Sequence, residues 1–234
     1  MIYPNFLYEK KVRKYGYQLI AGIDEVGRGA VAGPVVAGCV VFKPGLKIPS
    51  ASVRIDDSKK LTARKREVSS KWIKQNCLTW GVGEASAKEI DKLGIVKATN
   101  KAFRKAIGNA NQRFHKRIDY LLIDAFYIPY VRGIRMGNKM KKSRLKKDIR
   151  SNLKSIRRYG QQLAIIKGDE KSISISAASI IAKVYRDGLM SNWGGKKRYK
   201  KYGWKDNKGY ATSKHRLIIK KYGKSSKHRL SFLK

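Results

Sequence analysis

Acidic residues are scarce in this sequence: 16 Asp and Glu stand against 55 Lys and Arg over 234 residues, a formal net charge of +39. Such an excess of positive charge indicates a polyanionic partner, because Lys and Arg that bind phosphates release counterions. The alternative is a basic surface that meets only solvent. The 42% hydrophobic content argues against a disordered chain. We therefore expect a folded protein that binds nucleic acid.

Cysteine and histidine are also rare. Cys39 and Cys77 cannot form a disulfide framework, which favours a reducing compartment, and they have neither the spacing nor the nearby histidine of a zinc site. Metal-free cleavage of RNA through its own 2′-OH usually needs histidine as general acid and base. The chain has only His115, His215 and His228, which argues against a metal-free ribonuclease.

Long apolar segments are absent. The N-terminal residues lack the apolar core of a signal peptide. The longest nearly apolar run, Val31–Phe42, is too short to cross a bilayer. We therefore expect a cytoplasmic protein without membrane contact, and its length suits one domain with a small appendage.

Five short apolar runs predict β-strands. They are Gln18–Asp24, Val35–Phe42, Leu78–Ala85, Tyr120–Ile123 and Leu163–Ile166. Helices are predicted near Ala63–Ile73 and over Ala87–Ile107 and Ser174–Met190. The first three strands suit an antiparallel meander. The order of elements predicts an α/β fold with a mixed five-stranded sheet flanked by helices.

Two basic segments hold most of the excess charge. Val131–Gly160 carries twelve Lys or Arg and one Asp, and Ser191–Lys234 carries fifteen and one. We divide the chain into a main domain, residues 1–190 with an insertion at about 131–160, and a C-terminal region, residues 191–234. The C-terminal region is also rich in Trp and Tyr, which suits phosphate contact with stacking on sugars and bases. The alternative is that these aromatic side chains fold back on the core. We expect each of the two arrangements to hold for some of the rings.

The few carboxylates share one pattern, since three apolar runs lead into acidic residues. LIAGIDE ends at Asp24 and Glu25, YLLID ends at Asp124, and LAIIKGDE reaches Asp169. A buried carboxylate is usually paired, hydrogen-bonded or bound to a metal, because its desolvation is costly. If the three strands are neighbours, their ends form an oxygen-rich site for Mg²⁺ or Mn²⁺. Taken singly, each residue could instead be satisfied by backbone N–H groups.

Two further acids compete for these roles, Glu170 and Asp187. Asp187 follows Arg186 on a predicted helix, so we expect it to be an ion-pair partner.

The stretch from Gly27 to Pro34 is glycine-rich, with the spacing G-x-G-x-x-x-G. It is not the G-x-G-x-x-G of a dinucleotide site, and it leads to a strand rather than a helix. We expect a tight loop whose backbone N–H groups approach a substrate, with Arg28 meeting a phosphate. A purely structural hairpin loop is the alternative.

Several motifs resemble those of the type 2 ribonucleases H (ribonuclease HII). GIDEVGRGAVAGPVVAG at 22–38 is similar to the opening signature of that family. The further matches follow in the family's order: DSKKL at 57–61, LLID at 121–124, KGDEKSISISAASIIAKVYRD at 167–187, KGYAT at 208–212 and HRLSF at 228–232. Together they span nearly the whole chain.

The resemblance implies a ribonuclease H-like fold with a small basic helical C-terminal region. It implies an endonuclease that hydrolyses the RNA strand of RNA·DNA hybrids and incises at ribonucleotides embedded in DNA, with a role in ribonucleotide excision repair. Two Mg²⁺ or Mn²⁺ ions would act with substrate bound, leaving 3′-OH and 5′-phosphate ends. The partner would be nucleic acid, and the protein would be a monomer.

Residue by residue, the resemblance assigns three groups of side chains. The metal ligands and catalytic residues would be Asp24, Glu25, Asp124 and Asp169. The 2′-OH of the ribonucleotide would be read by Gly27, Arg28 and Gly29, and Tyr210 would stack at the RNA–DNA junction. Other substrate contacts would come from Ser58, Lys59, Lys183 and Arg186.

The chain departs from the family pattern at two points. Ala125 stands where the family usually has Gly after the third carboxylate. Asp124 and Asp169 are 45 positions apart, which is longer than expected, and the surplus is Val131–Gly160. The assignment of Asp169 therefore depends on its KGD and SAASIIAKVYRD context.

Two other functions remain open at this point. A basic RNA- or DNA-binding protein without catalysis would gain nothing from four acids directed at phosphates. Another nuclease of the same fold, such as a junction resolvase, would need no reader of the 2′-OH.

Overall fold

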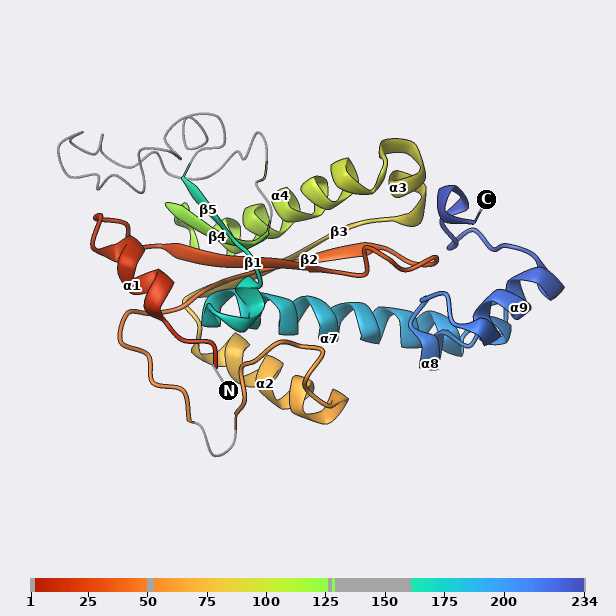
Figure 1. The fold of residues 1–234 in the computed structure, drawn as a ribbon, viewed down its shortest axis with the longest axis horizontal. Helices are drawn as coiled ribbons and strands as arrows, with labels where there is room; N and C mark the ends of the chain where they lie inside the picture. The colour runs from red at the N-terminus through yellow and green to blue at the C-terminus, as the bar shows by residue number, and fades with distance from the viewer. Residues whose placement is uncertain (1–2, 50–52, 126–127, 129–160, 234) are drawn as a thin grey trace.

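The computed structural model describes residues 3–49, 53–125, 128 and 161–233 (Figure 1). The basic segment Val131–Gly160, predicted to be an insertion, lies outside the described residues. Within the described ranges, no helix combines the length and the apolar character needed to cross a membrane.

One five-stranded sheet forms the centre of the molecule. Its strands are β1 (Ile20–Val26), β2 (Val35–Val41), β3 (Thr79–Ala85), β4 (Tyr120–Asp124) and β5 (Gln162–Ile165), in the spatial order β3-β2-β1-β4-β5. The first three strands pair antiparallel, which confirms the predicted meander. β4 is parallel to β1, and β5 is parallel to β4. The prediction of a mixed five-stranded sheet is therefore confirmed.

Helices cover both faces of this sheet. They are α1 (Leu7–Arg13), α2 (Ala63–Asn76), α3 (Ala87–Leu93), α4 (Ile95–Phe114), α7 (Ile173–Gly195), α8 (Trp204–Asn207) and α9 (Ser213–Tyr222), with short 3₁₀ helices at Gly168–Glu170, Lys200–Tyr202 and Leu230–Phe232. Figure 1 shows α4 along one face, and α7 with α2 below it along the other. The small α8 and α9 lie at the far end of α7, as expected for a helical C-terminal region.

The prediction of a single helix over Ala87–Ile107 is wrong, because the structure has two helices there. The first ends and the second begins at Gly94, whose φ of +75° lies in the region that favours glycine. Ser86 begins α3 with a capping box, in which its hydroxyl accepts from the Glu89 N–H and the Glu89 carboxylate accepts from the Ser86 N–H. α4 then continues to Phe114.

A glycine in β1 lets α7 pack directly on the sheet. A Cβ at Gly22 would lie 2.0 Å from the carbonyl carbon of Ser174, so no side chain fits between strand and helix. Asp24 comes two residues later and projects from the same face of β1. Its carboxylate therefore lies against α7, where Ser179 hydrogen-bonds to it.

Aromatic side chains hold the C-terminal region together. Tyr199, Tyr202 and Trp204 are buried in one cluster, whereas Tyr222 remains 49% exposed. The expectation that some of these rings fold back on the protein is thus confirmed for the first three. α7 runs on to Gly195, so one helix continues across residue 190.

Candidate active site

Two of the predicted carboxylates lie side by side at one edge of the sheet. β1 and β4 are parallel, and Ile23 pairs with Ile123. Asp24 and Asp124 follow these residues directly, so they occupy equivalent positions on neighbouring strands. The chain therefore places two acids, 100 positions apart in sequence, at the same point of the fold.

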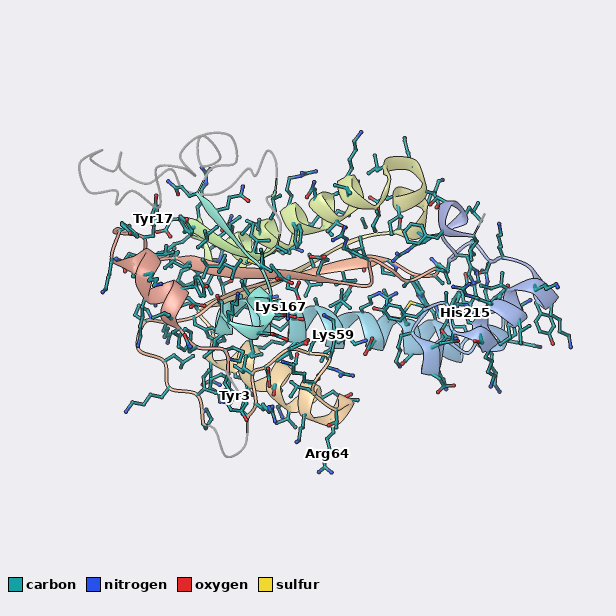
Figure 2. All side chains as sticks on the ribbon, in the orientation of Figure 1. Tyr3, Tyr17, Lys59, Arg64, Lys167 and His215 are labelled. Carbon is teal, nitrogen blue, oxygen red and sulfur yellow. The ribbon has the colours of Figure 1, made fainter. Side chains whose placement is uncertain are left out.

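The third predicted position, Asp169, lies on a turn rather than on a strand. β5 ends at Ile165, and Asp169 belongs to the 3₁₀ helix Gly168–Glu170 that leads into α7. The Gly168 N–H donates to Asp124 Oδ1 over 2.7 Å, which ties this turn to the end of β4. In Figure 2, Lys167 of this turn is labelled near the start of α7, and Lys59 is labelled further along the same helix.

Burial and nearby negative charges raise the pKa values of Asp24, Glu25 and Asp169. Burial, followed by the charges of Glu25 and Asp124, holds the pKa of Asp24 well above its usual value. Burial raises the pKa of Glu25 to about 7, although Arg28 opposes the shift. Burial and the charge of Asp124 raise the pKa of Asp169 to about 6. Crowded carboxylates of this kind bind a cation favourably, because it removes the repulsion.

The donor set fits a hard divalent cation in an open site. Glu25 Oε1 accepts from Arg28 Nη1 at 3.3 Å, but Glu25 Oε2 is buried and has no hydrogen-bond partner among the described residues. In the part of the chain that the structure describes, no three His, Cys, Asp or Glu side chains form a group that could hold a metal ion as they stand. Oxygen donors that leave room for water and substrate oxygens suit Mg²⁺ or Mn²⁺.

Ser58 and Lys59, which are predicted to contact substrate, lie beside this cluster. The buried Ser58 hydroxyl shares a 2.9 Å hydrogen bond with Ser179 Oγ, which fixes the segment against α7. Lys59 Nζ is 3.8 Å from Asp169 Oδ2, and its side chain is 82% exposed. Desolvation opposes the shift, but the charges of Asp57, Asp169, Asp24 and Asp124 raise the pKa of Lys59. An exposed ammonium group therefore stands at the rim of the acidic site.

The two glycines of the predicted reading loop have different surroundings. Gly27 has a φ of +89°, and a Cβ there would lie 2.1 Å from Arg186 Nε. A Cβ at Gly29 would meet no atom within 4 Å. The fold itself thus demands Gly27, whereas the space in front of Gly29 is open to a ligand.

Arg186 and Lys183, both predicted substrate contacts, have different surroundings. Arg186 is 0% exposed and donates to the carbonyl oxygens of Pro34, Ala32 and Lys208, so it lies behind the loop and away from solvent. Lys183 Nζ donates to Asp187 Oδ1 at 2.8 Å. Asp187 also lies 3.7 Å from Arg66, which confirms it as an ion-pair partner. The other competing acid, Glu170, pairs with Lys60 at 3.1 Å.

Tyr210 is placed beside the loop by backbone hydrogen bonds. The Gly209 carbonyl accepts from the N–H groups of Val31 and Ala32 at 2.9 and 3.1 Å. The half-buried Tyr210 ring lies 5.3 Å from the Arg186 guanidinium carbon and 5.8 Å from Lys183 Nζ. The loop and the aromatic side chain predicted to act with it are therefore neighbours.

Two buried residues around the site were not found from the sequence. Glu9 of α1 accepts from the hydroxyls of Ser172 and Ser174 at 2.7 and 2.6 Å, and so anchors the turn that carries Asp169. Arg229 donates to carbonyl oxygens of the Gly27–Gly33 loop. Arg229 stands in the HRLSF motif, which was a signal for it. For Glu9, the only signal in the sequence was that acidic residues are scarce.

Comparisons with known proteins identify the family and the fold. The family model described as Ribonuclease HII matches residues 21–234. A protein named Ribonuclease HII from Clostridioides difficile (strain 630) is 43% identical, over 100% of this chain and 75% of the relative. The crystal structure of ribonuclease H2 from Pyrococcus horikoshii OT3 has the same fold, with a TM-score of 0.63, 24% identity and coverage of 91% and 92% of the two chains. A Bst-RNase HIII structure in complex with Mn²⁺ gives a TM-score of 0.62 at 19% identity, over 90% of this chain and 65% of that one.

Proposed function

This chain belongs to the ribonuclease HII family and is a ribonuclease H-type endoribonuclease, and from this we propose that it also incises duplex DNA at single embedded ribonucleotides. The observation that carries the proposal is the convergence of Asp24, Asp124 and the Asp169 turn at a sheet edge that continues into the Gly27–Gly29 loop. Chemistry and sugar recognition would then act within one short stretch of β1 and the loop after it.

Four carboxylates would hold the metal ions in this proposal: Asp24, Glu25, Asp124 and Asp169. The raised pKa values of Asp24, Glu25 and Asp169 and the unpartnered Glu25 oxygen support it, as does Mn²⁺ in the structurally similar ribonuclease HIII. When two Mg²⁺ or Mn²⁺ ions are bound with substrate, they supply an activated water and stabilise the leaving 3′ oxygen, which gives 3′-OH and 5′-phosphate ends.

The neighbouring residues of the chain would orient the substrate. The exposed Lys59 ammonium can bind a phosphate oxygen at the rim of the acidic site, while Ser58 keeps its segment fixed on α7. Backbone N–H groups of Gly27–Gly29 would donate to the 2′-OH, and Gly29 adds no side chain that would keep the sugar away. Arg28 would contact a phosphate.

Tyr210 would stack at the RNA–DNA junction, next to the loop. Lys183 would contact the backbone nearby, whereas Arg186 would act through the loop it supports. In this scheme residues 1–190 carry the catalytic centre, and the basic residues 191–234 help to hold the duplex. We expect the protein to act as a monomer.

One assay tests the proposed function. The protein is incubated with duplex DNA containing one ribonucleotide, with long RNA·DNA hybrid and with plain DNA, each with Mg²⁺, Mn²⁺ or EDTA. We expect metal-dependent cleavage of the first two substrates only. Binding without cleavage would favour a non-catalytic binder, and cleavage of plain DNA would favour another nuclease of this fold.

A further inference from the structure

Two arginines are completely buried beneath the reading loop. Arg186 and Arg229 are both 0% exposed, and each donates three hydrogen bonds to main-chain carbonyl oxygens. Burying a guanidinium group is costly unless its donors are satisfied. Its five N–H donors form a rigid fork, which fixes the carbonyls it binds in one arrangement.

Arg229 belongs to a tail segment that pairs with the loop as a short β-bridge. Ala32 and His228 pair antiparallel. The Gly33 N–H donates to the Lys227 carbonyl at 2.8 Å, and the Arg229 N–H donates to the Val31 carbonyl at 2.8 Å. The tail thus meets the loop through backbone bonds on either side of His228, directly before the Arg229 side chain.

The two shortest bonds from Arg229 are made to the reading residues. Nη2 donates to the Gly27 carbonyl and Nη1 to the Arg28 carbonyl, both at 2.7 Å. Each carbonyl shares a planar trans peptide with the next residue's N–H, which points the opposite way. By holding these two oxygens, Arg229 directs the N–H groups of Arg28 and Gly29 away from itself. No atom lies within 4 Å of the position that a Cβ of Gly29 would occupy, so the space in front of Gly29 is open.

We propose that Arg229 is a positioning residue for sugar recognition: it sets the direction of the Arg28 and Gly29 N–H donors and thereby the preference for ribose over deoxyribose. Arg229 itself does not touch the substrate. The inference rests on the proposed function, since it assumes that this loop reads the 2′-OH. Asp91 of α3 supports the same arrangement, because it accepts from the N–H groups of Leu230 and Ser231 at 3.0 Å each.

The test compares Arg229→Lys with the wild-type protein. Lysine keeps the charge but cannot hold two adjacent carbonyls as a fork. Dissociation constants are measured in EDTA for a duplex with one ribonucleotide and for the all-DNA duplex of the same sequence, and cleavage rates are measured with Mg²⁺. We expect the ribose preference to fall about fivefold, the value of roughly one hydrogen bond, with unchanged affinity for plain DNA. The cleavage rate at the ribonucleotide should fall in parallel.

A matched control is Arg216→Lys, because Arg216 is an exposed arginine that also donates to a main-chain carbonyl, that of Ala211. Its ribose preference should equal that of the wild type. If Arg229→Lys does not fold, Asp91→Ala provides the second variant, since it loosens the tail without touching the buried arginine. It should lower the ribose preference in the same direction by a smaller factor.

The possible results separate the inference from the proposed function. A folded Arg229→Lys protein with the wild-type ribose preference would overturn the inference. Equal losses on ribose-containing and plain duplexes would also overturn it, because they would indicate a general structural role. A wild-type protein that neither prefers nor cuts the ribonucleotide-containing duplex would instead refute the proposed function.

Discussion

Buried charges have opposite signs at the acidic edge of the sheet and beneath the reading loop. At the edge, Asp24, Glu25 and Asp169 are crowded, and burial raises their pKa values. Under the loop, the buried charges are the positive Arg186 and Arg229, and main-chain carbonyls satisfy them. In the proposed function the edge is completed by a bound cation, whereas the buried arginines under the loop are already satisfied within the protein. Chemistry would then depend on an added ligand, and recognition on preorganised backbone.

The largest expected effect comes from the edge. Asp124→Asn should lower cleavage by more than roughly a hundredfold, because one ligand charge is lost from a two-ion site. Duplex binding should remain, since the basic surface is unchanged. Single-turnover cleavage and fluorescence anisotropy measure the two quantities. Asp206→Asn, an exposed acid in α8, is the matched control. Near wild-type turnover of Asp124→Asn at any Mg²⁺ or Mn²⁺ concentration would contradict the metal-site assignment.

The loop predicts contrasting effects for its two glycines. Gly27→Ala should destabilise the protein by on the order of 3 kcal/mol, because φ is +89° and Arg186 Nε lies 2.1 Å from the new methyl group. Gly29→Ala should leave thermal stability unchanged and reduce cleavage at a ribonucleotide. Thermal unfolding of both variants, with cleavage assays on Gly29→Ala, tests this. Full activity of Gly29→Ala would mean that no substrate group approaches there.

The tail below the loop should be sensitive to acid. Burial and the adjacent His215, whose Nε2 is 3.2 Å from His228 Nε2, lower the pKa of His228 to about 4; Lys224 acts in the same direction. The folded state then binds fewer protons than the unfolded state, in which histidine has a pKa of about 6.5. Stability is complete above pH 6.5 and is lost as the pH falls toward 4, by up to about 3 kcal/mol.

Urea unfolding between pH 4 and 7 measures this loss, and His228→Gln serves as the comparison. The difference in stability between wild type and variant should shrink as the pH falls, which removes the contribution of the carboxylates common to both. A constant difference across that range would show that His228 has the same pKa in the folded and the unfolded state, and would contradict the prediction.

Tyr210 tests whether recognition extends beyond the loop. Tyr210→Ala should weaken cutting at a single ribonucleotide more than cutting within a long hybrid, because a stacking contact is worth on the order of 1–3 kcal/mol. Cleavage rates on the two substrates provide the comparison. Equal losses on both would exclude Tyr210 from reading the junction.

The smallest expected effect lies just after the third carboxylate. Ala125 has a φ of +52°, at the position where the family resemblance leads one to expect glycine. Ala125→Gly should stabilise the protein by about 0.5–1 kcal/mol, because it relieves this conformation at some cost in chain entropy. Ala125→Ser keeps a Cβ and should bring no gain in the unfolding temperature. An unchanged or lower unfolding temperature for Ala125→Gly would show that the backbone at Ala125 is not strained.

The sequence predicted elements whose signal is local. All five strands follow from short apolar runs, and the positions of Asp24 and Asp124 follow from two of these runs that lead into acids. The break at Gly94 was missed because apolar residues continue at helical spacing across it, although Val96 proves to be 60% exposed. There the capping box and a positive φ outweigh the periodicity.

Contacts between distant segments could not be predicted in the same way. Arg229 binds Gly27 across 202 positions, and its acceptors are carbonyl oxygens, which every residue possesses. Nothing in a side-chain pattern identifies such a partner. Asp169 was predicted from an apolar run that reaches an acid, but a turn rather than a strand carries it, and its assignment as a ligand depended on its motif context.

The bridge between Ala32 and His228 also affects when the protein becomes selective during its synthesis. The strands that carry Asp24 and Asp124 leave the ribosome well before residues 227–229, and N-terminal segments generally fold first. Until those late residues arrive, the carbonyls of the loop lack the guanidinium that holds them. In the proposed function, the nascent chain would thus acquire Asp24 and Asp124 early and its sugar reader later. Recognition of the ribose would be delayed until the tail has been made.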